Sequence, residues 1–561
     1  MRPALCLLGL LVTTSCSGGG AAWQPVTDAR LKDAASDDGW LMYLRTYDAH
    51  AHAPFDQINA RNVARLHVVF TRSFSIPEGY EAPPIVNGRT MIATTPLDRV
   101  YAMDAVTGKP LWEYSRNIPK VALRTVCCDM VNRGVALYGN DAYLATLDAH
   151  VVAIDARSGK VDWDRALAAP GIGYAMTAAP LAVHGSIIAG VSCGEYGARG
   201  FLEALDAATG AQRWRFYTVP SPSEPGGKTW PGATYRHGGA CPWMTPSYDA
   251  ATNTIYVGTS NPSPWLWLEH PGQNLYTDSI LALDADTGRL KWYFQQTPND
   301  PWDYDATATP LLANLTIGGK PRPVLFQAAR NGWLYLIDRR DGSLIYMKRY
   351  TMATSVTGYD RSRRIGTVDA ALKPQIGQAI FTCPAFFGAD NWWAFALDPA
   401  AHDVFVPTMH TCMKLSGQKP PKLFHPGAGA LDEGFAVMPM PGAYGWGALQ
   451  AFDLRTGARV WTKETKYPWT DGTLSTGGGL VFSGTPDRKF YALDSRTGRP
   501  LWTFVAHSGF VGQPVTYRVD GKQYVAVQNG YGGVTPFWGG KKVAPMFRRI
   551  PLGGTLYVFS L

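Results

Sequence analysis

Short apolar stretches of strand length recur along the chain, and each leads into the same polar turn. The recurring unit is Ala-apolar-Asp-x-x-Thr-Gly-x-x-x-Trp, at a spacing of roughly 40 to 60 residues. A weaker copy has Tyr346 in the Trp position, and a degenerate copy survives as Ala396-Leu-Asp398. In each unit Asp can cap backbone N–H groups, Gly can take a positive φ, and the next strand presents a Trp. The clear copies are Asp104 with Trp112, Asp155 with Trp163, Asp206 with Trp214, Asp284 with Trp292, Asp453 with Trp461 and Asp494 with Trp502.

These eight units predict the fold. No long segment has the 3.6-residue period of an amphipathic helix, so a parallel α/β enzyme is disfavoured. We predict an all-β, eight-bladed β-propeller with tryptophan-docking repeats, in which residues 39–561 form one domain. Ring closure removes open sheet edges, and the last strand, Thr555 to Leu561, is placed to pair with an N-terminal strand such as Leu66 to Phe70.

The first residues have the pattern of a secretory signal. Met1-Arg2-Pro3 is followed by an apolar run and then by small residues, and the run is too short to span a bilayer. We interpret residues 1–15 as a signal peptide and residues 16–38 as a flexible segment. Two alternatives stay open, lipid attachment at Cys16 and simple cleavage near Ala22. No later stretch predicts a membrane helix, so we expect a periplasmic protein, soluble or lipid-anchored.

Composition and charge exclude other classes. The 561 residues are 46% hydrophobic and 17% charged, which excludes disorder for most of the chain. The net charge is +8 and the basic residues are scattered singly, so the sequence shows no cluster of Lys and Arg of the kind that binds nucleic acid. The sequence leaves the oligomeric state open, with a homodimer as one alternative.

Three motifs outside the repeat carry a family resemblance. They are Cys127-Cys128-Asp-x-Val-Asn-Arg-Gly134, Gly258-Thr-Ser-Asn-Pro-Ser-Pro-Trp265 and Trp302-Asp-Tyr-Asp305. Together with the repeat, they resemble the pyrroloquinoline quinone (PQQ) dependent methanol/ethanol dehydrogenase family over nearly the whole mature chain. The resemblance implies oxidation of a primary alcohol to an aldehyde by hydride transfer to PQQ. It also implies an external periplasmic cytochrome c as electron acceptor, since the sequence has no Cys-x-x-Cys-His haem motif.

The resemblance also implies a cofactor site. From the residues alone, Cys127 and Cys128 read as two unrelated thiols and Trp243 as a core indole. The family uses such a pair as a vicinal disulfide over the PQQ ring, with the indole stacked beneath it. Arg330 corresponds to the family residue beside the reactive carbonyl. Other positions that match groups binding the PQQ tricarboxylate are Glu81, Arg133, Thr177, Ser192, Asn391 and Trp392.

A metal site follows in the same way. By resemblance Glu195 and Asn261 bind the ion, and Asp303 is both a ligand and the catalytic base, although a lone Asn or Asp more commonly caps a turn. Asp305 stands two residues after Asp303, and extended backbone places both side chains on one side. The extra carboxylate favours a lanthanide(III) ion over Ca²⁺, and family members with Asp at this position use lanthanides. The alternative is a surface Asp bound to water.

The remaining cysteines and one Trp complete the expectations. Cys383 and Cys412 match a second family disulfide, although alone they could be free thiols. For Cys193 and Cys241 we favour two independent buried thiols over a third disulfide between adjacent blades. Trp265 is expected to line the substrate pocket and to favour apolar alcohols.

A second hypothesis comes from another class. A non-catalytic propeller lipoprotein with PQQ-like repeats can act as an outer-membrane assembly scaffold, and Cys16 fits that role. A scaffold has no reason to retain Glu195, Asn261, Asp303 and Trp243 together, so we favour the enzyme.

Overall fold

The computed structural model describes residues 23–421, 425–532 and 545–561. The predicted signal peptide, Cys16 and Ala22 lie outside these residues. Within them, no helix combines the length and the apolar character needed to cross a membrane. The two short helices among the labelled elements are α1 (Asp28–Lys32) and α2 (Lys120–Leu123).

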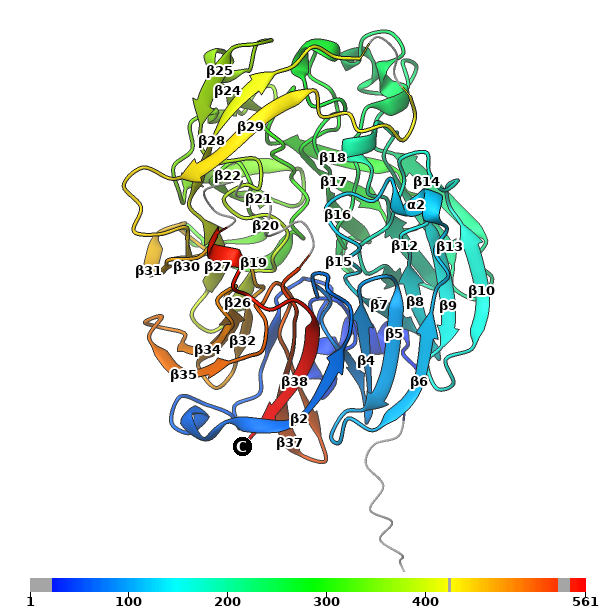
Figure 1. Cartoon of the computed structure of the whole chain (residues 1–561), viewed down its shortest axis with the longest axis vertical. Helices are drawn as coiled ribbons and strands as arrows, with labels where there is room; N and C mark the ends of the chain where they lie inside the picture. The colour runs from blue at the N-terminus through cyan, green and yellow to red at the C-terminus, as the bar shows by residue number, and fades with distance from the viewer. Residues whose placement is uncertain (1–22, 422–424, 533–544) are drawn as a thin grey trace, which may run out of the picture.

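The strands form antiparallel sheets that surround a common centre (Figure 1). The first sheet has β3 (Ile85–Asn87), β4 (Thr90–Thr95), β5 (Arg99–Asp104) and β6 (Pro110–Ser115). The second has β7 (Val135–Tyr138), β8 (Asp141–Ala145), β9 (His150–Asp155) and β10 (Val161–Ala166). The third has β11 (Leu181–Val183), β12 (Ser186–Gly190), β13 (Phe201–Asp206) and β14 (Gln212–Tyr217).

The next sheets repeat the arrangement. One has β15 (Ser247–Asp249), β16 (Thr254–Gly258), β17 (Ser279–Asp284) and β18 (Leu290–Gln295), extended by β24 (Ile365–Val368) and β23 (Val356–Asp360). Another has β19 (Leu311–Ile317), β20 (Lys320–Ala328), β21 (Trp333–Asp338) and β22 (Ser343–Arg349). A further sheet has β26 (Ala396–Asp398), β27 (Asp403–Met409), β30 (Gly447–Asp453) and β31 (Arg459–Thr465).

The last sheets join the two ends of the described chain. One has β32 (Leu474–Thr476), β33 (Leu480–Gly484), β34 (Lys489–Asp494) and β35 (Pro500–Val505), with β1 (His52–Ala53) at its inner edge. In the closing sheet, β36 (Val515–Val519), β37 (Lys522–Asn529) and β38 (Gly554–Ser560) pair with β2 (His67–Phe74), and Thr71 lies opposite Tyr557. Figure 1 shows β2 in blue beside β38 in red, so the predicted pairing of the last strand with an N-terminal strand is confirmed.

The repeat residues form the contacts between neighbouring sheets. Trp112 Nε1 on β6 donates to the carbonyl oxygen of Ala156 at 2.9 Å, and a Cβ on Gly159 would meet the Trp112 ring at 2.8 Å. The same contact recurs along the chain. The indole of Trp502 donates to Leu66 at 3.1 Å, at the start of β2, and Phe70 packs on Gly108. The prediction that each Trp packs between neighbouring blades is confirmed.

One unit of the predicted repeat was misassigned. Ala396-Leu-Asp398 forms β26, the inner strand of the sheet whose third strand, β30, ends at Asp453. Two counted units therefore share one sheet, and the closing sheet of β2 and β36–β38 contains no copy. The short Ala-Leu-Asp pattern was wrongly counted as a separate unit, because any apolar strand that ends in an Asp turn produces it.

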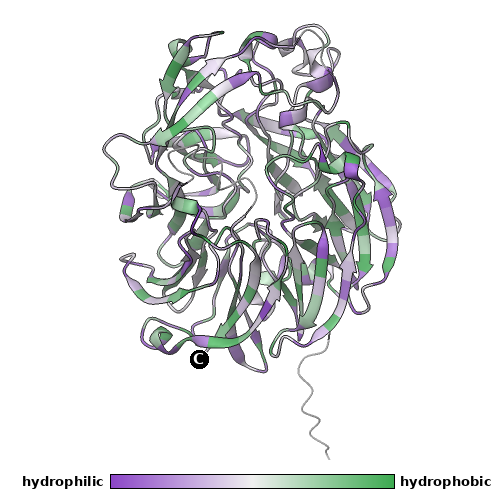
Figure 2. Cartoon of the chain, viewed as in Figure 1, coloured by the Kyte–Doolittle hydropathy of each residue, from purple (hydrophilic) through white to green (hydrophobic). Residues whose placement is uncertain are grey.

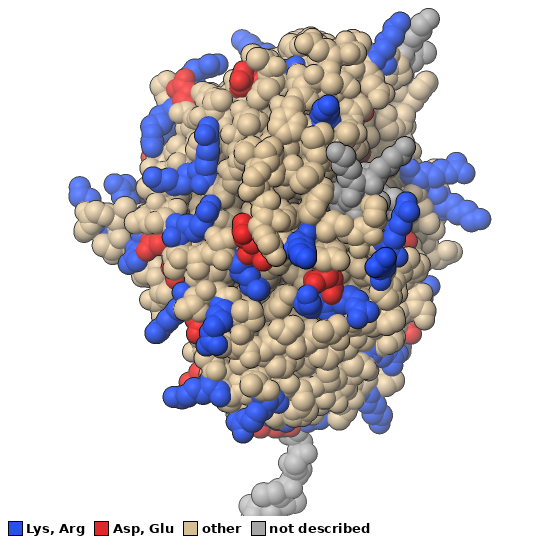
Figure 3. Space-filling model, turned by 60° about the vertical axis from the view of Figure 1, so that its left-hand side comes forward, with Lys and Arg blue, Asp and Glu red and all other residues tan. Residues whose placement is uncertain are grey.

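The core lies in the inner strands. In β4 five of six residues are buried, whereas the outer strand β6 is exposed or half-buried throughout. Figure 2 shows the corresponding hydrophobic colouring of inner strands and mixed colouring of outer ones. On the face seen in Figure 3, Lys and Arg side chains are dispersed among uncharged residues, with acidic side chains between them.

Two segments differ from the expectations. Residues 23–38, expected to be flexible, pack on the sheets: Val26 is fully buried and pairs with Gly139, and Leu31 of α1 is 2% exposed. Burial of these apolar side chains opposes disorder. Outside the repeat, β25 (Ala379–Thr382), β28 (Thr411–Gly417) and β29 (Glu433–Pro439) form a separate sheet beside the ring.

Candidate active site

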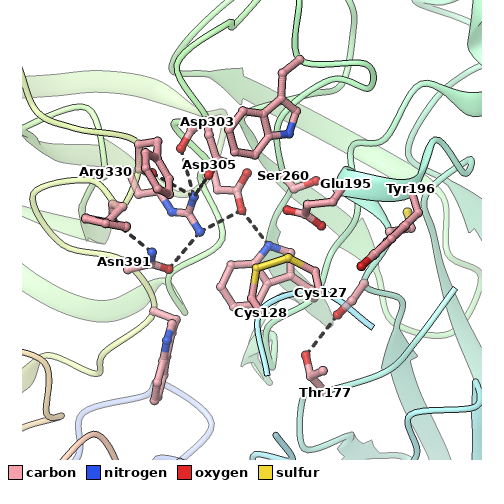
Figure 4. A pocket seen from close by; sticks show the side chains of 18 of the residues that line it. Cys127, Cys128, Thr177, Glu195, Tyr196, Ser260, Asp303, Asp305, Arg330 and Asn391 are labelled. Carbon is pink, nitrogen blue, oxygen red and sulfur yellow. Dashed lines mark hydrogen bonds and ion pairs between the residues drawn. A yellow bond between two sulfur atoms is a disulfide. The ribbon is translucent and has the colours of Figure 1, made fainter. Parts of the chain in front are cut away.

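A pocket of about 400 Å³ brings together most of the residues singled out in the sequence (Figure 4). Its volume lies within the range of roughly 300–1,000 Å³ found for ligand sites. Asn261 is absent from its lining, although the adjacent Ser260 is present. The predicted residues in the lining are Glu81, Cys127, Cys128, Arg133, Thr177, Ser192, Glu195, Trp243, Trp265, Asp303, Asp305, Arg330, Asn391 and Trp392.

One wall of the pocket is a vicinal disulfide. Cys127 and Cys128 are joined to each other in the segment after α2, and Cys128 has a φ of 66°. A left-handed backbone is uncommon for a residue with a side chain, and such strain is concentrated at functional sites. Both sulfur atoms and one carboxylate oxygen of Glu195 lie within 4.8 Å of one another. The disulfide therefore faces a carboxylate across the pocket.

Two indoles and a guanidinium also line the pocket. The guanidinium carbon of Arg133 lies 5.0 Å from the ring centroid of Trp243 and 4.6 Å from that of Trp392. At these distances the cation interacts favourably with both rings. The indole N–H of Trp243 donates to Oδ2 of Asp305 at 2.7 Å, which fixes the plane of the ring.

The polar end of the pocket is organised around Arg133. Its guanidinium lies 2.7 Å from Oε2 of Glu81 and donates to Oγ1 of Thr177 at 2.8 Å, and Thr177 lies 3.0 Å from the hydroxyl of Ser192. Burial raises the pKa of Glu81 to about 7, although Arg133 opposes the shift. The Nε atoms of Arg133 and Arg330 are buried and donate no hydrogen bond. Free buried guanidinium donors of this kind fit an anionic ligand such as the PQQ tricarboxylate.

The other end gathers two carboxylates around Arg330. The guanidinium lies 3.0 Å from Oδ2 of Asp303 and 3.2 Å from Oδ2 of Asp305, and donates to Oδ1 of Asn391 at 2.9 Å. Asp303 has a φ of 60°, a second left-handed residue in this site. Burial raises the pKa of Asp303 well above its usual range; Arg330 opposes this shift and Asp305 adds to it. Asp303 is therefore a buried carboxyl group held beside a guanidinium inside the pocket.

Oxygen atoms suited to a hard cation lie at the same end. Oδ1 of Asp303 and Oδ1 of Asn261 are buried and accept no hydrogen bond. Burial raises the pKa of Glu195 to about 7, and the nearby Asp305 carboxylate adds to the shift, so a cation would lower the energy of both charged groups. The donor set fits a hard cation, because such ions take carboxylate and amide oxygens.

The alternative of a surface Asp bound to water is wrong for Asp305. It is 3% exposed, and both of its oxygens face the site: Oδ1 accepts from the backbone N–H of Asn261 at 2.7 Å. Its Oδ2 contacts both Arg330 and the indole N–H of Trp243, and Figure 4 shows the carboxylate beside Arg330. Asp305 thus links the base region to the loop that carries Asn261.

An aromatic mouth of the pocket was not predicted from the sequence. Trp265 lies 6.1 Å from Phe386 between ring centroids, and Phe386 lies 4.4 Å from Phe435 on β29. Phe387 and Leu431 also line the pocket. The Phe386-Phe387 pair after Cys383-Pro384 is a weak signal in the sequence, whereas nothing in the repeat indicates that β29 reaches the site.

The structure contains three disulfides among the described residues. Cys383 is joined to Cys412, as the family resemblance implies. Cys193 is joined to Cys241 with 5.7 Å between the Cα atoms, so the expectation of two independent thiols was wrong. The two residues are 48 positions apart, but the loops after β12 and before β15 meet where adjacent sheets converge.

Comparisons with known proteins agree with this site. The family model described as the PQQ beta-propeller domain of glucose/ethanol/alcohol dehydrogenases matches residues 40–355 and 443–525. The quinoprotein alcohol dehydrogenase PedH of Pseudomonas putida is 37% identical, over 91% of this chain and 89% of PedH. The quinoprotein ethanol dehydrogenase of Pseudomonas aeruginosa is 34% identical, over 100% of this chain and 96% of its own length.

Solved structures give the same result. A structure described as a europium-containing methanol dehydrogenase superposes with a TM-score of 0.91 and 31% identity, over 95% of this chain and 100% of that chain. The quinohemoprotein alcohol dehydrogenase ADHIIG of Pseudomonas putida superposes with a TM-score of 0.90 and 34% identity, over 96% of this chain and 82% of that chain. The chain therefore belongs to the PQQ-dependent quinoprotein alcohol dehydrogenase family, whose mostly-β propeller oxidises alcohols with PQQ.

Proposed function

We propose that this enzyme oxidises primary alcohols to aldehydes, with Asp303 as the base that takes the hydroxyl proton. The observation that carries the proposal is the meeting of Asp303 and Arg330, 3.0 Å apart, in a pocket that the vicinal disulfide and Trp243 also line. When bound, PQQ supplies the hydride acceptor, and a metal ion beside it supplies a Lewis acid.

The residues of the chain have separable tasks in this proposal. Asp303 takes the hydroxyl proton on its carboxylate, whose Oδ1 accepts no hydrogen bond from the protein and is the atom left for the metal ion, and whose Oδ2 lies 3.0 Å from Arg330. Arg330 holds positive charge where negative charge develops. The disulfide of Cys127 and Cys128 and the ring of Trp243 would exclude water from the bound cofactor, and Arg133 with Thr177 would bind its carboxylates.

We further propose a lanthanide ion in preference to Ca²⁺, bound by Glu195, Asn261, Asp303 and Asp305. The pKa values of Glu195, Asp303 and Asp305 are all raised in the ion-free protein, with burial as the main cause in each case. A trivalent ion offsets this buried negative charge better than a divalent one. The similar structure that is described as containing europium supports the same choice.

Substrate, acceptor and location follow as parts of the proposal. The aromatic mouth of Trp265, Phe386 and Phe435 favours an apolar alcohol. The absence of Cys-x-x-Cys-His from the sequence favours an external cytochrome c as acceptor, and the N-terminal pattern of residues 1–15 favours the periplasm. We keep lipid attachment at Cys16 and a homodimer as alternatives for this protein.

We also infer eight blades in one domain over residues 39–561. The support is the number of sheets that contain four neighbouring antiparallel strands, including the closing sheet of β2 and β36–β38. The additional sheet of β25, β28 and β29 is not counted as a blade, because it has three strands.

The test is an alcohol panel assayed with PQQ plus either Ca²⁺ or La³⁺. We expect dye reduction with primary apolar alcohols and higher activity with La³⁺. If the protein shows neither a quinone absorbance nor dye reduction with any alcohol, the enzyme proposal fails and the scaffold alternative returns.

The metal proposal has a separate variant test. Asp305→Ala should weaken activity with La³⁺ more than activity with Ca²⁺, because it removes one negative group from the site. Ser192→Ala, which lies at the carboxylate-binding end of the pocket, is the control and should change both activities alike. Full activity of the wild type with Ca²⁺ and no response to La³⁺ would remove Asp305 from the ligand set.

A further inference from the structure

The disulfide between Cys193 and Cys241 lies at the edge of the proposed metal site. Both residues are buried, with exposures of 2% and 0%. Cys193 immediately precedes the short 3₁₀ helix Gly194–Tyr196, which carries Glu195. Cys241 stands two residues before Trp243. The bond therefore joins the segment of one expected ligand to the segment of the stacking indole.

A third site segment is attached to the same point. The backbone N–H of Cys241 donates to Oγ of Ser260 at 2.9 Å, and the N–H of Ser260 donates to the carbonyl of Cys241 at 3.1 Å. The N–H of Ala240 donates to the carbonyl of Asn261 at 3.0 Å. Asn261 in turn donates its N–H to Asp305 at 2.7 Å. Cys241 is thus the junction of the segments that carry Glu195, Trp243 and Asn261.

The loop that carries Glu195 is attached mainly near its two ends. The chain leaves the sheet at Gly190 and returns at Phe201, the start of β13. Near these ends, Ser192 exchanges two backbone hydrogen bonds with Ala175, and Ala198 and Gly200 bond to the backbone of Gly239. In the turn between them, the carbonyls of Glu195 and Tyr196 accept from Ala430 and Gly427, so residues 193–197 have fewer backbone bonds and lower local stability than the ends of the loop.

Steric contacts on both sides of the bond are close. A Cβ on Gly194 would lie 2.8 Å from Oδ1 of Asn261, and a Cβ on Gly190 would overlap the carbonyl of Pro242. The two segments fit against each other only when the loop is held at its present position. Without the covalent bond, the carboxylate of Glu195 and that of Asp305 would repel one another and favour separation of the segments.

We propose that the Cys193–Cys241 disulfide is a positioning element that holds the segments of Glu195, Trp243 and Asn261 in place before the metal ion and PQQ bind. The proposal rests on the function proposed above. A metal ion binds more tightly to preorganised ligands, because the free-energy cost of ordering the loop has already been met during folding. Residues that orient metal ligands typically change metal affinity by about 10- to 100-fold when they are replaced.

The test compares two disulfide deletions in the full chain. The variant is Cys193→Ala/Cys241→Ala, and the matched control is Cys383→Ala/Cys412→Ala, which removes a bond between residues 29 positions apart rather than 48. Both variants lose chain-entropy stabilisation of similar size. The probes are Tb³⁺, followed by its luminescence, and PQQ, followed by its absorbance.

We expect the Cys193→Ala/Cys241→Ala protein to bind Tb³⁺ about 10- to 100-fold more weakly than the wild type. PQQ binding should fall at low metal concentration and recover when Tb³⁺ is raised. The control should lose a similar number of degrees in melting temperature and keep its Tb³⁺ affinity within about threefold. A second variant, Cys193→Ala/Cys241→Val, refills the space of the sulfur atoms and should recover stability without recovering affinity.

Three outcomes would overturn the proposal. Wild-type Tb³⁺ affinity in the Cys193 variant, or an equal loss of affinity in the control, would show that the bond only stabilises the fold. Full recovery of affinity with Cys241→Val would assign the effect to packing. If the wild type binds Tb³⁺ and PQQ but oxidises no alcohol, the proposed function fails while the positioning role stands.

Discussion

At the scale of single residues, the pocket concentrates carboxylates in a place where burial opposes their charge. Asp303, Asp305 and Glu195 all have raised pKa values, and among the described residues Arg330 is the cation paired directly with both Asp303 and Asp305. The ion-free site is therefore under electrostatic strain that a bound cation relieves. A bound cation would therefore favour the charged form of Asp303, which is the form that can accept a proton.

The first prediction concerns this base. Asp303→Asn should retain PQQ and lose about 10²- to 10⁴-fold in kcat, because an amide cannot take the hydroxyl proton. PQQ content is measured by absorbance and kcat by dye reduction. Asp300→Asn is the control, because Asp300 caps the backbone N–H groups of Trp302 and Tyr304 on the same loop and has no role in proton transfer. A kcat of Asp303→Asn close to that of the wild type would remove this residue from the mechanism.

The second prediction concerns Glu81 and pH. Burial raises the pKa of Glu81 from 4.5 to about 7 in the folded protein, and Arg133 only partly offsets it. Between these values the unfolded chain releases the proton first, so stability is complete below pH 4.5 and is lost as pH rises to about 7. The size is about 3 kcal/mol at most. Denaturant titrations of the cofactor-free protein at pH 5 and pH 8 should show this loss, and Glu81→Gln should show less of it.

The residues that sequence could identify are those whose chemistry stands in a short motif. Asp303, Cys127 and Trp243 were predicted in this way, and the structure places them in one pocket. The bond between Cys193 and Cys241 could not be predicted, because it depends on where two loops of adjacent sheets meet. Phe435 was missed for a similar reason, since it comes from a sheet outside the repeat.

At the scale of elements, the contact between each outer-strand Trp and the next sheet holds neighbouring sheets together. The indole N–H of Trp214 donates to the carbonyl of Ala285 at 3.0 Å, and its ring covers Gly288, which has a φ of +68°. Glycine is required at this position for two reasons, the left-handed backbone conformation and the close approach of the ring. This double requirement explains why the Thr-Gly turn and the Trp recur together in the sequence.

The third prediction separates these two requirements. Gly521 also has a positive φ, +72°, but a Cβ there would meet nothing within 4 Å, whereas a Cβ on Gly288 would lie 2.5 Å from the Trp214 ring. Gly521→Ala should lose about 1–2 kcal/mol through the backbone alone. Gly288→Ala should lose a further 1–3 kcal/mol through overpacking. Equal losses in denaturant titrations would show that the indole contact adds nothing to the stability of the turn.

The repeat predicted most blades because its Gly and Trp are fixed by this contact. It failed at Asp398, where an inner strand ends in the same three residues but has no Thr-Gly turn and no Trp. It also gave no signal for the sheet of β25, β28 and β29. That sheet covers the pocket mouth and has no neighbouring blade to dock, so nothing constrains its sequence to the repeat.

At the scale of the whole molecule, stability depends on the seam between β2 and β38. The hydroxyls of Ser73 and Thr555 lie 3.3 Å apart across this seam and are separated by 482 residues in the sequence. Among the described residues two strand pairings join the ends of the chain, the short pairing of β1 with β32 and the longer pairing of β2 with β38. Closing the seam therefore costs much more loop-closure entropy than forming any hairpin in the ring.

The fourth prediction uses that difference. Ser73→Cys/Thr555→Cys should form a disulfide across the seam, and Thr357→Cys/Thr367→Cys, whose hydroxyls lie 3.2 Å apart, should form one in a hairpin 10 residues apart. The seam bond should stabilise the fold by about 3 kcal/mol more than the hairpin bond. Denaturation midpoints of the oxidised variants measure this. Equal gains would indicate that the unfolded chain already keeps its ends close together.

The seam also separates its two strands in time during synthesis. About 480 residues lie between β2 (His67–Phe74) and its partner β38 (Gly554–Ser560). At roughly 5–20 residues per second, the interval between the two strands is on the order of 25–100 s. During that interval β2 has an unpaired edge, and β37 still lacks its second neighbour. Until β38 pairs with β2, the molecule is thus an open row of sheets that needs protection from other chains, and this last pairing turns the row into a ring.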